Sequence, residues 1–214
     1  MIASFLLVGE QPYAAAMVES LKAVHGCTVV QMSDLKTSKV HGVDEVVRIP
    51  FRIPLMPYRL KHLASYPHDE MLIVDTDVIA KREISDVWKL SFDVALTKRA
   101  LGDFGYGDDG QLDMPYNTGV MLSRGTEFWN ECQNWLLSQS ADLQNWYGDQ
   151  RAVCAIAERG HYGVLALTCA EFNWSPNSRD DSSDARFWHY KGGIRKKWMP
   201  GYQRPELRKS LGNS

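Results

Sequence analysis

The stretch "MLIVDTDVIA", residues 71–80, joins four apolar residues directly to two aspartates. A short, continuous apolar run is typical of a strand that is buried on both faces, as in a parallel sheet. Side chains two residues apart point to the same face of a strand, so we expect Asp75 and Asp77 to share a face and Thr76 to turn away. The sequence therefore predicts a buried strand over Met71–Asp75 with a carboxylate pair at its carboxyl end.

The carboxylate pair needs a counter-charge, because like charges this close repel each other unless a cation or a proton intervenes. In a first interpretation, a divalent metal links the pair to a phosphorylated ligand. In a second, the pair belongs to a phosphatase of the haloacid dehalogenase type, where the first aspartate is a nucleophile. The motif of that family usually lies near the chain start, whereas some 70 residues precede it here, and its later acidic pair should follow an apolar strand, whereas Asp180 and Asp181 lie in the polar stretch "NSRDDSSD". In a third, the acids are structural and cap the next turn or pair with Arg82 or Lys81.

The composition is that of an ordinary globular domain. The chain has 214 residues, of which 44% are hydrophobic and 23% charged, with a net charge of −2. This total charge gives no reason to expect binding to nucleic acid or a membrane. The opening apolar stretch, MIASFLLVG, lacks a basic region and is too short to span a bilayer. Four scattered cysteines without a Cys-x-x-Cys pair favour a reducing cytoplasm over a zinc site or a disulfide framework.

The charge is uneven near the carboxyl end of the chain. Between residues 191 and 209, seven basic residues accompany one acid, Glu206. We expect this run to bind phosphate or to make peripheral contact with an anionic membrane surface, and a solvated basic tail is the alternative. The basic residues are Lys191, Arg195, Lys196, Lys197, Arg204, Arg208 and Lys209.

Short apolar runs alternate with helical patterns, which favours an α/β domain with a central, mostly parallel sheet. The expected helices run from Pro12 to the residue before Gly26, over Thr126–Gln139, and over Asp149–Glu158, the last closed by Gly160. We expect loops over Ala100–Met114 and Ser175–Asp184, and irregular chain after Lys191. The expected strands are Ser4–Val8, Thr28–Met32, Glu45–Ile49, Met71–Asp75, Val94–Thr97, Thr118–Leu122 and Gly163–Leu167.

Polar groups follow several of these strands. In open α/β sheets, ligands bind beyond the carboxyl ends of the strands. Asp75 and Asp77, Gly9–Gln11, and Ser33–Asp34 lie at such ends, and Asn117 lies near a strand start. We therefore expect one edge of the sheet to carry the functional groups.

Four segments, "MPYRLKHLASYPHDEMLIVDTDVIA", "YNTGVMLS", "WYGDQRAVCAIA" and "RFWHYKGGIRKKW", occur in this order. Together they resemble glycosyltransferase family 8, which includes glycogenin-like and galactosyltransferase-like proteins, over residues 3–198. The resemblance implies the GT-A type nucleotide-diphospho-sugar transferase fold, with a single Rossmann-like domain over residues 1–198 and a basic tail over 199–214.

The resemblance also implies an activity. It is the metal-dependent transfer of a hexose from a nucleotide-diphosphate sugar, in the first instance a UDP-sugar, with retention of anomeric configuration. The implied metal is Mn²⁺ or Mg²⁺, with Asp75, Asp77 and His189 as its ligands. The acceptor stays open between a glycan, a lipid-linked molecule, a protein and others. A catalytically silent nucleotide-sugar binding protein and the phosphatase are the alternatives.

Further residues acquire roles from the resemblance. Arg59, Asn117 and Gly119 would contact the donor sugar or orient the acids, and Asp149 and Gln150 would lie at the reaction centre. Asp149 is also well placed as an ordinary helix N-cap.

The nucleotide would lie beside the first strand and the late basic segment. The resemblance implies contacts from the first turn, with Tyr13 near the base, and from the metal-binding turn and the glycine-containing segment that follows His189. The sixth residue after His189 is Arg195, whereas alignment on Trp198 favours Lys196 for the diphosphate, so both stay candidates. The implied nucleotide-binding residues are Val8, Gly9, Tyr13, Thr76, Gly192 and Lys196.

Overall fold

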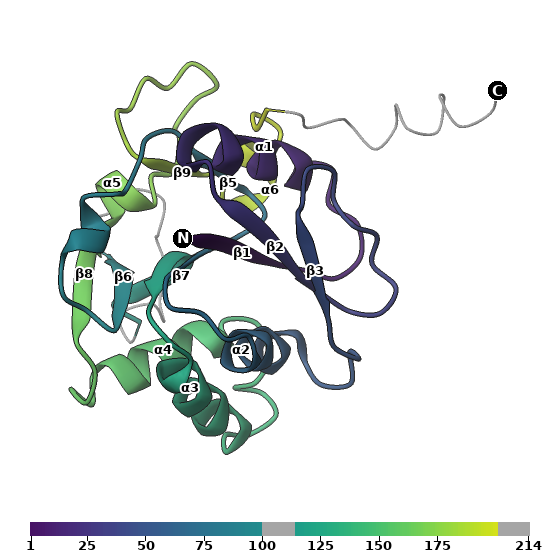
Figure 1. The fold of residues 1–214 in the computed structure, drawn as a ribbon, viewed down its shortest axis with the longest axis vertical. Coiled ribbons are helices and arrows are strands. Elements are labelled where there is room, and N and C mark those ends of the chain that lie inside the picture. The colour runs from purple at the N-terminus through teal and green to yellow at the C-terminus, as the bar shows by residue number, and fades with distance from the viewer. Residues whose placement is uncertain (100–113, 201–214) are drawn as a thin grey trace.

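The structure, a computed structural model, describes residues 1–99 and 114–200. Within this part of the chain, seven strands form the central sheet: β1 (Ile2–Leu7), β2 (Thr28–Ser33), β3 (Glu45–Arg48), β4 (Met71–Val74), β6 (Val94–Lys98), β7 (Tyr116–Ser123) and β8 (Val164–Thr168). Their spatial order is β3-β2-β1-β4-β7-β6-β8 (Figure 1).

The sheet is mostly parallel. Strand β1 pairs in parallel with β2 and β4, β2 with β3, and β6 with β8. Strand β7 runs antiparallel between β4 and β6. The α/β class with a central, mostly parallel sheet is therefore confirmed, and each expected strand is present, although β4 ends at Val74 rather than Asp75.

The sheet separates two hydrophobic cores (Figure 1). Along β4, Leu72 and Val74 join the core that contains α1 (Ala14–His25), while Met71 and Ile73 join the other. All four side chains are buried, which explains the unbroken apolar run, and each contributes roughly 1.5–3 kcal/mol of transfer free energy. The second core is covered by α2 (Leu55–Ser65), α3 (Glu127–Leu137) and α4 (Gly148–Ala157).

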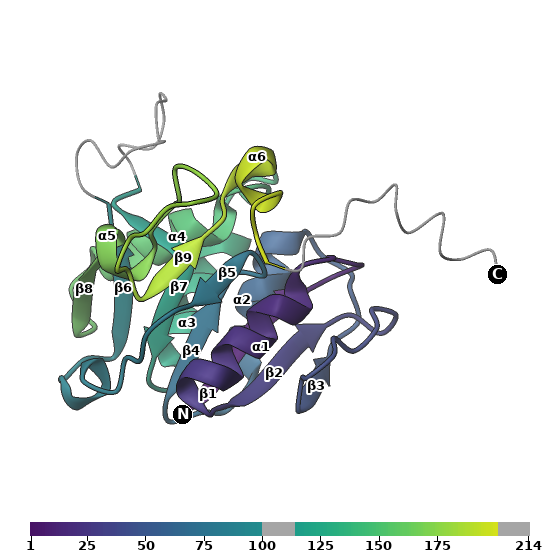
Figure 2. The same ribbon diagram turned by 90° about the horizontal axis from the view of Figure 1, so that it is seen from above.

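A second, two-stranded sheet packs on the α1 side. Its strands, β5 (Val78–Ala80) and β9 (Phe187–His189), are antiparallel, with Val78 opposite His189. Figure 2 shows this small sheet between α1 and α5 (Cys169–Phe172), with α6 (Gly192–Lys196) just after β9. The pairing brings a residue from near the end of the described chain next to Asp77. A short 3-10 helix, η1, spans Val87–Lys89.

Three expectations about helices are wrong in detail. Helix α1 begins at Ala14 instead of Pro12, because residues 12 and 13 form a turn, although Gly26 does end the helix with a left-handed φ of 57°. Helix α4 begins at Gly148, so Asp149 lies inside the first turn and is not the N-cap. The chain after Lys191 is not irregular throughout, since α6 follows it directly.

Other expectations concern loops and termini. Residues 175–184 form the expected loop, without helix or strand. The expected loop over Ala100–Met114 lies outside the described residues except for Met114, and the tail over 199–214 except for residues 199 and 200. The boundary between the domain and the tail stays a prediction.

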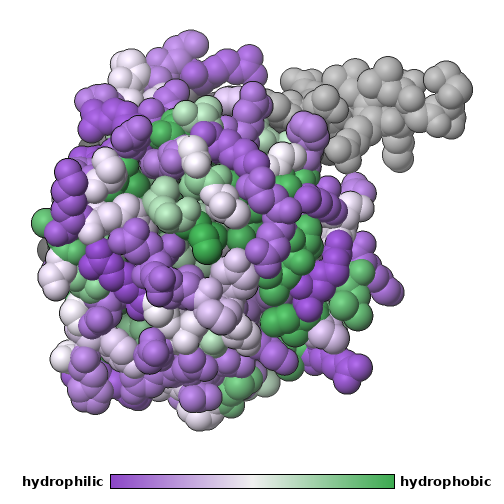
Figure 3. Space-filling model, viewed as in Figure 1, coloured by the Kyte–Doolittle hydropathy of each residue, from purple (hydrophilic) through white to green (hydrophobic). Residues whose placement is uncertain are grey.

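Among residues 1–99 and 114–200, no helix is long and apolar enough to cross a membrane. In the view of Figure 3, hydrophilic residues cover most of the surface, and hydrophobic residues gather in patches between them.

Candidate functional site

The two aspartates lie in a turn that connects the large sheet to the small one. Asp75, Thr76 and Asp77 follow β4 and precede β5. Both acids therefore lie outside the strands, whereas the expected strand included Asp75. The backbone N–H of Asp75 donates to the carbonyl of Gly119 at 2.9 Å, and the N–H of Tyr190 donates to the carbonyl of Asp77 at 2.9 Å. Because β7 and the segment after β9 both hold this turn, its carboxylates project from a fixed backbone.

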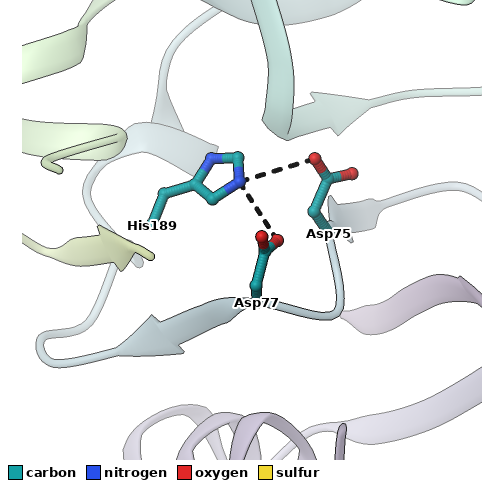
Figure 4. A group of neighbouring side chains, drawn as sticks. All are labelled: Asp75, Asp77 and His189. Carbon is teal, nitrogen blue, oxygen red and sulfur yellow. Dashed lines mark ion pairs between the residues drawn. The ribbon is translucent and has the colours of Figure 1, made fainter. Parts of the chain in front are cut away.

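Figure 4 shows Asp75, Asp77 and His189 turned toward one another. The Nε2 atom of His189 lies 3.1 Å from Oδ1 of Asp77 and 3.6 Å from Oδ2 of Asp75. One potential ligand atom from each residue lies within 4.8 Å of the other two. Two carboxylates and an imidazole suit a divalent cation such as Mn²⁺, and the carboxylates also suit Mg²⁺. The three residues form a candidate metal site, the only such cluster in the described parts of the chain.

Two basic side chains also contact the acids. The Arg59 guanidinium lies 2.8 Å from the carboxylate of Asp75 and 2.8 Å from that of Asp149, and Lys196 Nζ lies 2.9 Å from Asp77. Arg59 comes from α2 and its side chain is 11% exposed, so it is a buried bridge between the metal-site turn and α4.

The structural interpretation of the acids named the wrong partners. Arg82 pairs with Asp184 and Glu171, and Lys81 lies over the ring of Trp188, so neither forms an ion pair with Asp75 or Asp77 among the described residues.

Basic neighbours oppose the effect of burial on the pKa values of two acids in the site, and they outweigh it at Asp77 but not at Asp149. Burial alone would raise the pKa of Asp77, but His189 and Lys196 hold that pKa well below its usual range. Burial raises the pKa of Asp149 against the opposing effect of Arg59. Burial would lower the pKa of Lys196, but Asp77 raises it. Asp77 is therefore a carboxylate at neutral pH, which is the form that binds a cation.

Amide side chains surround the ring of His189. Its Nδ1 atom lies 2.7 Å from Oδ1 of Asn173, and Asn173 Nδ2 donates to Oδ1 of Asn117. Asn117 Nδ2 in turn donates to Oε1 of Gln150 at 3.4 Å. The structure thus brings together Asn117 and Gln150, as expected, with Asn173, which the sequence analysis missed. The one signal for Asn173 in the sequence is a lone amide in the aromatic run "FNW".

Gly119 makes room for the imidazole. A Cβ atom at this position would lie 2.3 Å from both Nδ1 and Cε1 of His189, a distance that no side chain tolerates. The His189 ring fills this space, and the contact of Gly119 with the donor sugar that the resemblance implies stays a prediction.

The remaining predicted residues lie around the same edge. Gly9, after Val8 at the end of β1, has a φ of 82° and donates its N–H to Thr37 Oγ1 at 2.7 Å. Tyr13 is buried, with Lys196 Nζ 5.5 Å from the centre of its ring.

The two residues predicted as alternatives for binding the diphosphate, Arg195 and Lys196, have different partners in the structure. Gly192 opens α6 with a φ of 75°. Arg195 donates from Nε to the carbonyl of Pro176 at 2.8 Å, whereas Lys196 reaches Asp77. Of the two, Lys196 is the residue that faces the candidate metal site.

No protein-family model matches the chain, and no curated protein matches it in sequence. Among solved structures, the chain is similar to the galactosyltransferase LgtC in complex with donor and acceptor sugar analogs, with a TM-score of 0.62 and 15% identity over 99% of this chain and 100% of that one. It is also similar to an active-site mutant of LgtC, with a TM-score of 0.63 and 15% identity over 97% and 99% of the two chains. These matches confirm the GT-A type fold.

Proposed function

We propose that this protein is a metal-dependent glycosyltransferase, which moves a hexose from a nucleotide-diphosphate sugar, in the first instance a UDP-sugar, to an acceptor with retention of configuration. The observation that carries the proposal is the cluster of Asp75, Asp77 and His189 on a fold like that of a galactosyltransferase. The LgtC structure is described as a complex with donor and acceptor sugar analogs, and we extend both kinds of ligand to this chain.

The three clustered residues would hold Mn²⁺ or Mg²⁺. When bound, such a cation acts as a Lewis acid toward the negative charge of a departing diphosphate. Lys196 adds a positive charge at the same place, since its Nζ lies 2.9 Å from Asp77. We expect Lys196 to turn from Asp77 to the diphosphate oxygens, where preorganised positive charge stabilises the leaving group. The backbone of Gly192 would approach the same phosphates.

Arg59, Asp149, Gln150 and Asn117 would hold the sugar. Arg59 contacts both Asp75 and Asp149 at 2.8 Å, so it fixes α4 relative to the metal-site turn. Asp149 and Gln150 are 4% and 3% exposed, and such buried polar groups recognise sugar hydroxyls with little competition from water. We propose Asp149 and Gln150 as the reaction-centre residues, with the departing phosphate oxygen taking the proton of the acceptor.

The nucleotide would lie at the end of β1. Val8, Gly9 and Tyr13 come from the turn that follows this strand, and Thr76 lies between the two acids. Lys196 over the Tyr13 ring links this turn to the diphosphate end of the site.

The experiment that tests the proposal uses UDP-glucose, UDP-galactose and GDP-mannose, each with and without Mn²⁺, and measures release of the free nucleoside diphosphate. We expect release from a UDP-sugar to require Mn²⁺. The Asp77→Asn variant should be slower by at least about a hundredfold, because the cation that stabilises the departing diphosphate loses a carboxylate ligand. Asp142→Asn, on the surface between α3 and α4, is the matched control and should behave as wild type.

Other outcomes identify the alternatives. Tight, Mn²⁺-dependent UDP binding without release of product would indicate a catalytically silent nucleotide-sugar binding protein. Release of inorganic phosphate from sugar phosphates would indicate the phosphatase. The structure gives the phosphatase little support, because Asp181 accepts the backbone N–H groups of Asn177 and Ser183 at 2.9 Å and so caps its own loop.

A further inference from the structure

The two nitrogens of His189 have different surroundings. Nε2 faces Asp77 and Asp75, at 3.1 and 3.6 Å, and Nδ1 faces Oδ1 of Asn173 at 2.7 Å. His189 is 5% exposed and Asn173 is 2% exposed, so water does not replace this contact. Only an unprotonated Nε2 offers a lone pair to a cation, and the hydrogen bond at the other nitrogen decides which tautomer is present.

The direction of that hydrogen bond follows from a backbone group. Gly119 N lies 2.9 Å from Oδ1 of Asn117, and a backbone N–H can only donate. The side-chain amide of Asn117 is therefore oriented with its oxygen toward the backbone N–H of Gly119. Asn173 contacts the same oxygen through Nδ2, so its own oxygen must point the other way, toward His189. An amide oxygen only accepts, so the proton of this hydrogen bond must reside on Nδ1 of His189.

Thr97 fixes the Asn173 amide a second time. Its hydroxyl donates to the backbone carbonyl of Asn117 at 2.9 Å, which leaves the Thr97 oxygen to accept from Nδ2 of Asn173 at 3.5 Å. If the Asn173 amide were flipped, its oxygen would face the Asn117 oxygen in a buried site. Thr97 is 0% exposed and Asn117 is 8% exposed, so such a conflict would find no water to relieve it.

We propose that Asn173 is a positioning residue, which keeps the proton of the neutral His189 ring on Nδ1 and presents the Nε2 lone pair to the space between Asp75 and Asp77. The assignment deepens the proposed function, since a cation is the ligand that this lone pair would bind. Among the described residues, the carboxylates of Asp77 and Asp75 lie 3.1 and 3.6 Å from Nε2, so without Asn173 they are the acceptors that remain in contact with the ring nitrogens. The proton would then move to Nε2, donate to Asp77 and block the lone pair.

The first test observes the tautomer directly, by long-range ¹H–¹⁵N correlation on protein labelled with ¹⁵N-histidine at a pH at which the ring is neutral. We expect Nδ1 to carry the proton in the wild type. In Asn173→Leu, which has a similar volume and no acceptor, we expect the proton on Nε2. A proton on Nε2 in the wild type, or on Nδ1 in Asn173→Leu, would overturn the proposal.

Thr97→Val is the matched control. It removes a hydroxyl that contacts the same Asn173 amide, but it leaves the bond between Asn173 and His189 intact. We therefore expect the His189 tautomer of Thr97→Val to match that of the wild type. If Thr97→Val changed the tautomer as much as Asn173→Leu does, the His189 tautomer would respond to any change in the hydrogen bonds around Asn173. That result would overturn the specific role of Asn173.

The second test measures Mn²⁺ affinity by electron paramagnetic resonance of the free ion. We expect Asn173→Leu to bind Mn²⁺ about 10–100-fold more weakly than the wild type, and Thr97→Val to stay close to the wild type. Equal affinity of Asn173→Leu and the wild type would overturn this inference alone. A wild type that binds no Mn²⁺ would overturn the proposed function, while the tautomer measurement still decides the role of Asn173.

Discussion

At the scale of single residues, the site depends on buried polar groups that satisfy one another. His189 contacts Asp77 through one nitrogen and Asn173 through the other, and Gly119 leaves the space that its ring occupies. The sequence predicts the acids, because an apolar run that ends in Asp-x-Asp is visible without a structure. It does not predict that Gly119 and Asn173 contact His189, because these contacts join residues 70 and 16 positions apart.

His62 provides a test at the same scale. This residue of α2 is fully buried, with its ring centre 4.6 Å from that of Tyr58. Burial, helped by Lys61, lowers its pKa to about 4 from 6.5. The unfolded chain therefore binds this proton more readily than the folded one, so the stability that depends on neutral His62 is complete above pH about 6.5 and is lost as the pH falls toward 4.

We predict that His62→Phe reduces the acid sensitivity of the fold. Between pH 7 and pH 5, the free energy of unfolding of the wild type should fall more steeply than that of the variant, by at most about 1.4 kcal/mol per pH unit. Urea unfolding of both proteins at several pH values measures the difference. Because the other histidines are common to both, parallel pH dependences would mean that His62 is not the group responsible.

At the scale of elements, the helices with a clear apolar stripe were predictable and the short elements were not. Strands β5 and β9 have three residues each, which is too few to show alternation. Helix α2 contains Pro57, which discourages a helix prediction, but the proline lies in the first turn, where its missing N–H costs no intrahelical bond. Helix α6 begins with two glycines, which favour irregular chain.

Ion pairs hold β9 in place. Arg186, directly before β9, donates to the carboxylates of Asp86 and Glu171, with Nη2 2.8 Å from Asp86 and Nε 2.6 Å from Glu171. These bonds tie the strand that carries His189 to η1 and α5. The Arg186 side chain is 16% exposed and Asp86 is 60% exposed, so solvent screening limits their effect on global stability.

We predict that Arg186→Leu loosens the small sheet selectively. Hydrogen exchange followed by mass spectrometry should show faster exchange of the β5 and β9 amides, with β1, β2 and β4 unchanged. Arg82→Leu is the control, since its side chain is 43% exposed and its partner Asp184 is 87% exposed, and it should have a smaller effect. If Arg186→Leu accelerated amide exchange equally in all strands, or did not accelerate it in β9, Arg186 would not be the residue that holds β9 in place.

At the scale of the whole molecule, the reversed direction of β7 assembles the site. Because β7 runs antiparallel to β4, its beginning lies beside the carboxyl end of β4, and Asn117 and Gly119 reach the edge where Asp75 lies. The alternation of apolar runs and helical patterns predicted the α/β class, and the family resemblance predicted the GT-A fold. The alternation alone does not give the strand order, which depends on long-range pairing that local sequence does not encode.

The metal-linked nucleotide site is tested most directly by calorimetric titration of UDP into the wild type and Asp77→Asn, each with Mn²⁺ and with EDTA. We predict that Mn²⁺ strengthens UDP binding to the wild type by at least about tenfold, or roughly 1.4 kcal/mol, and that Asp77→Asn shows no such gain. Asp142→Asn should match the wild type. A wild-type affinity for UDP that is the same with Mn²⁺ and with EDTA would contradict the proposal that Asp75, Asp77 and His189 bind the cation that holds the diphosphate.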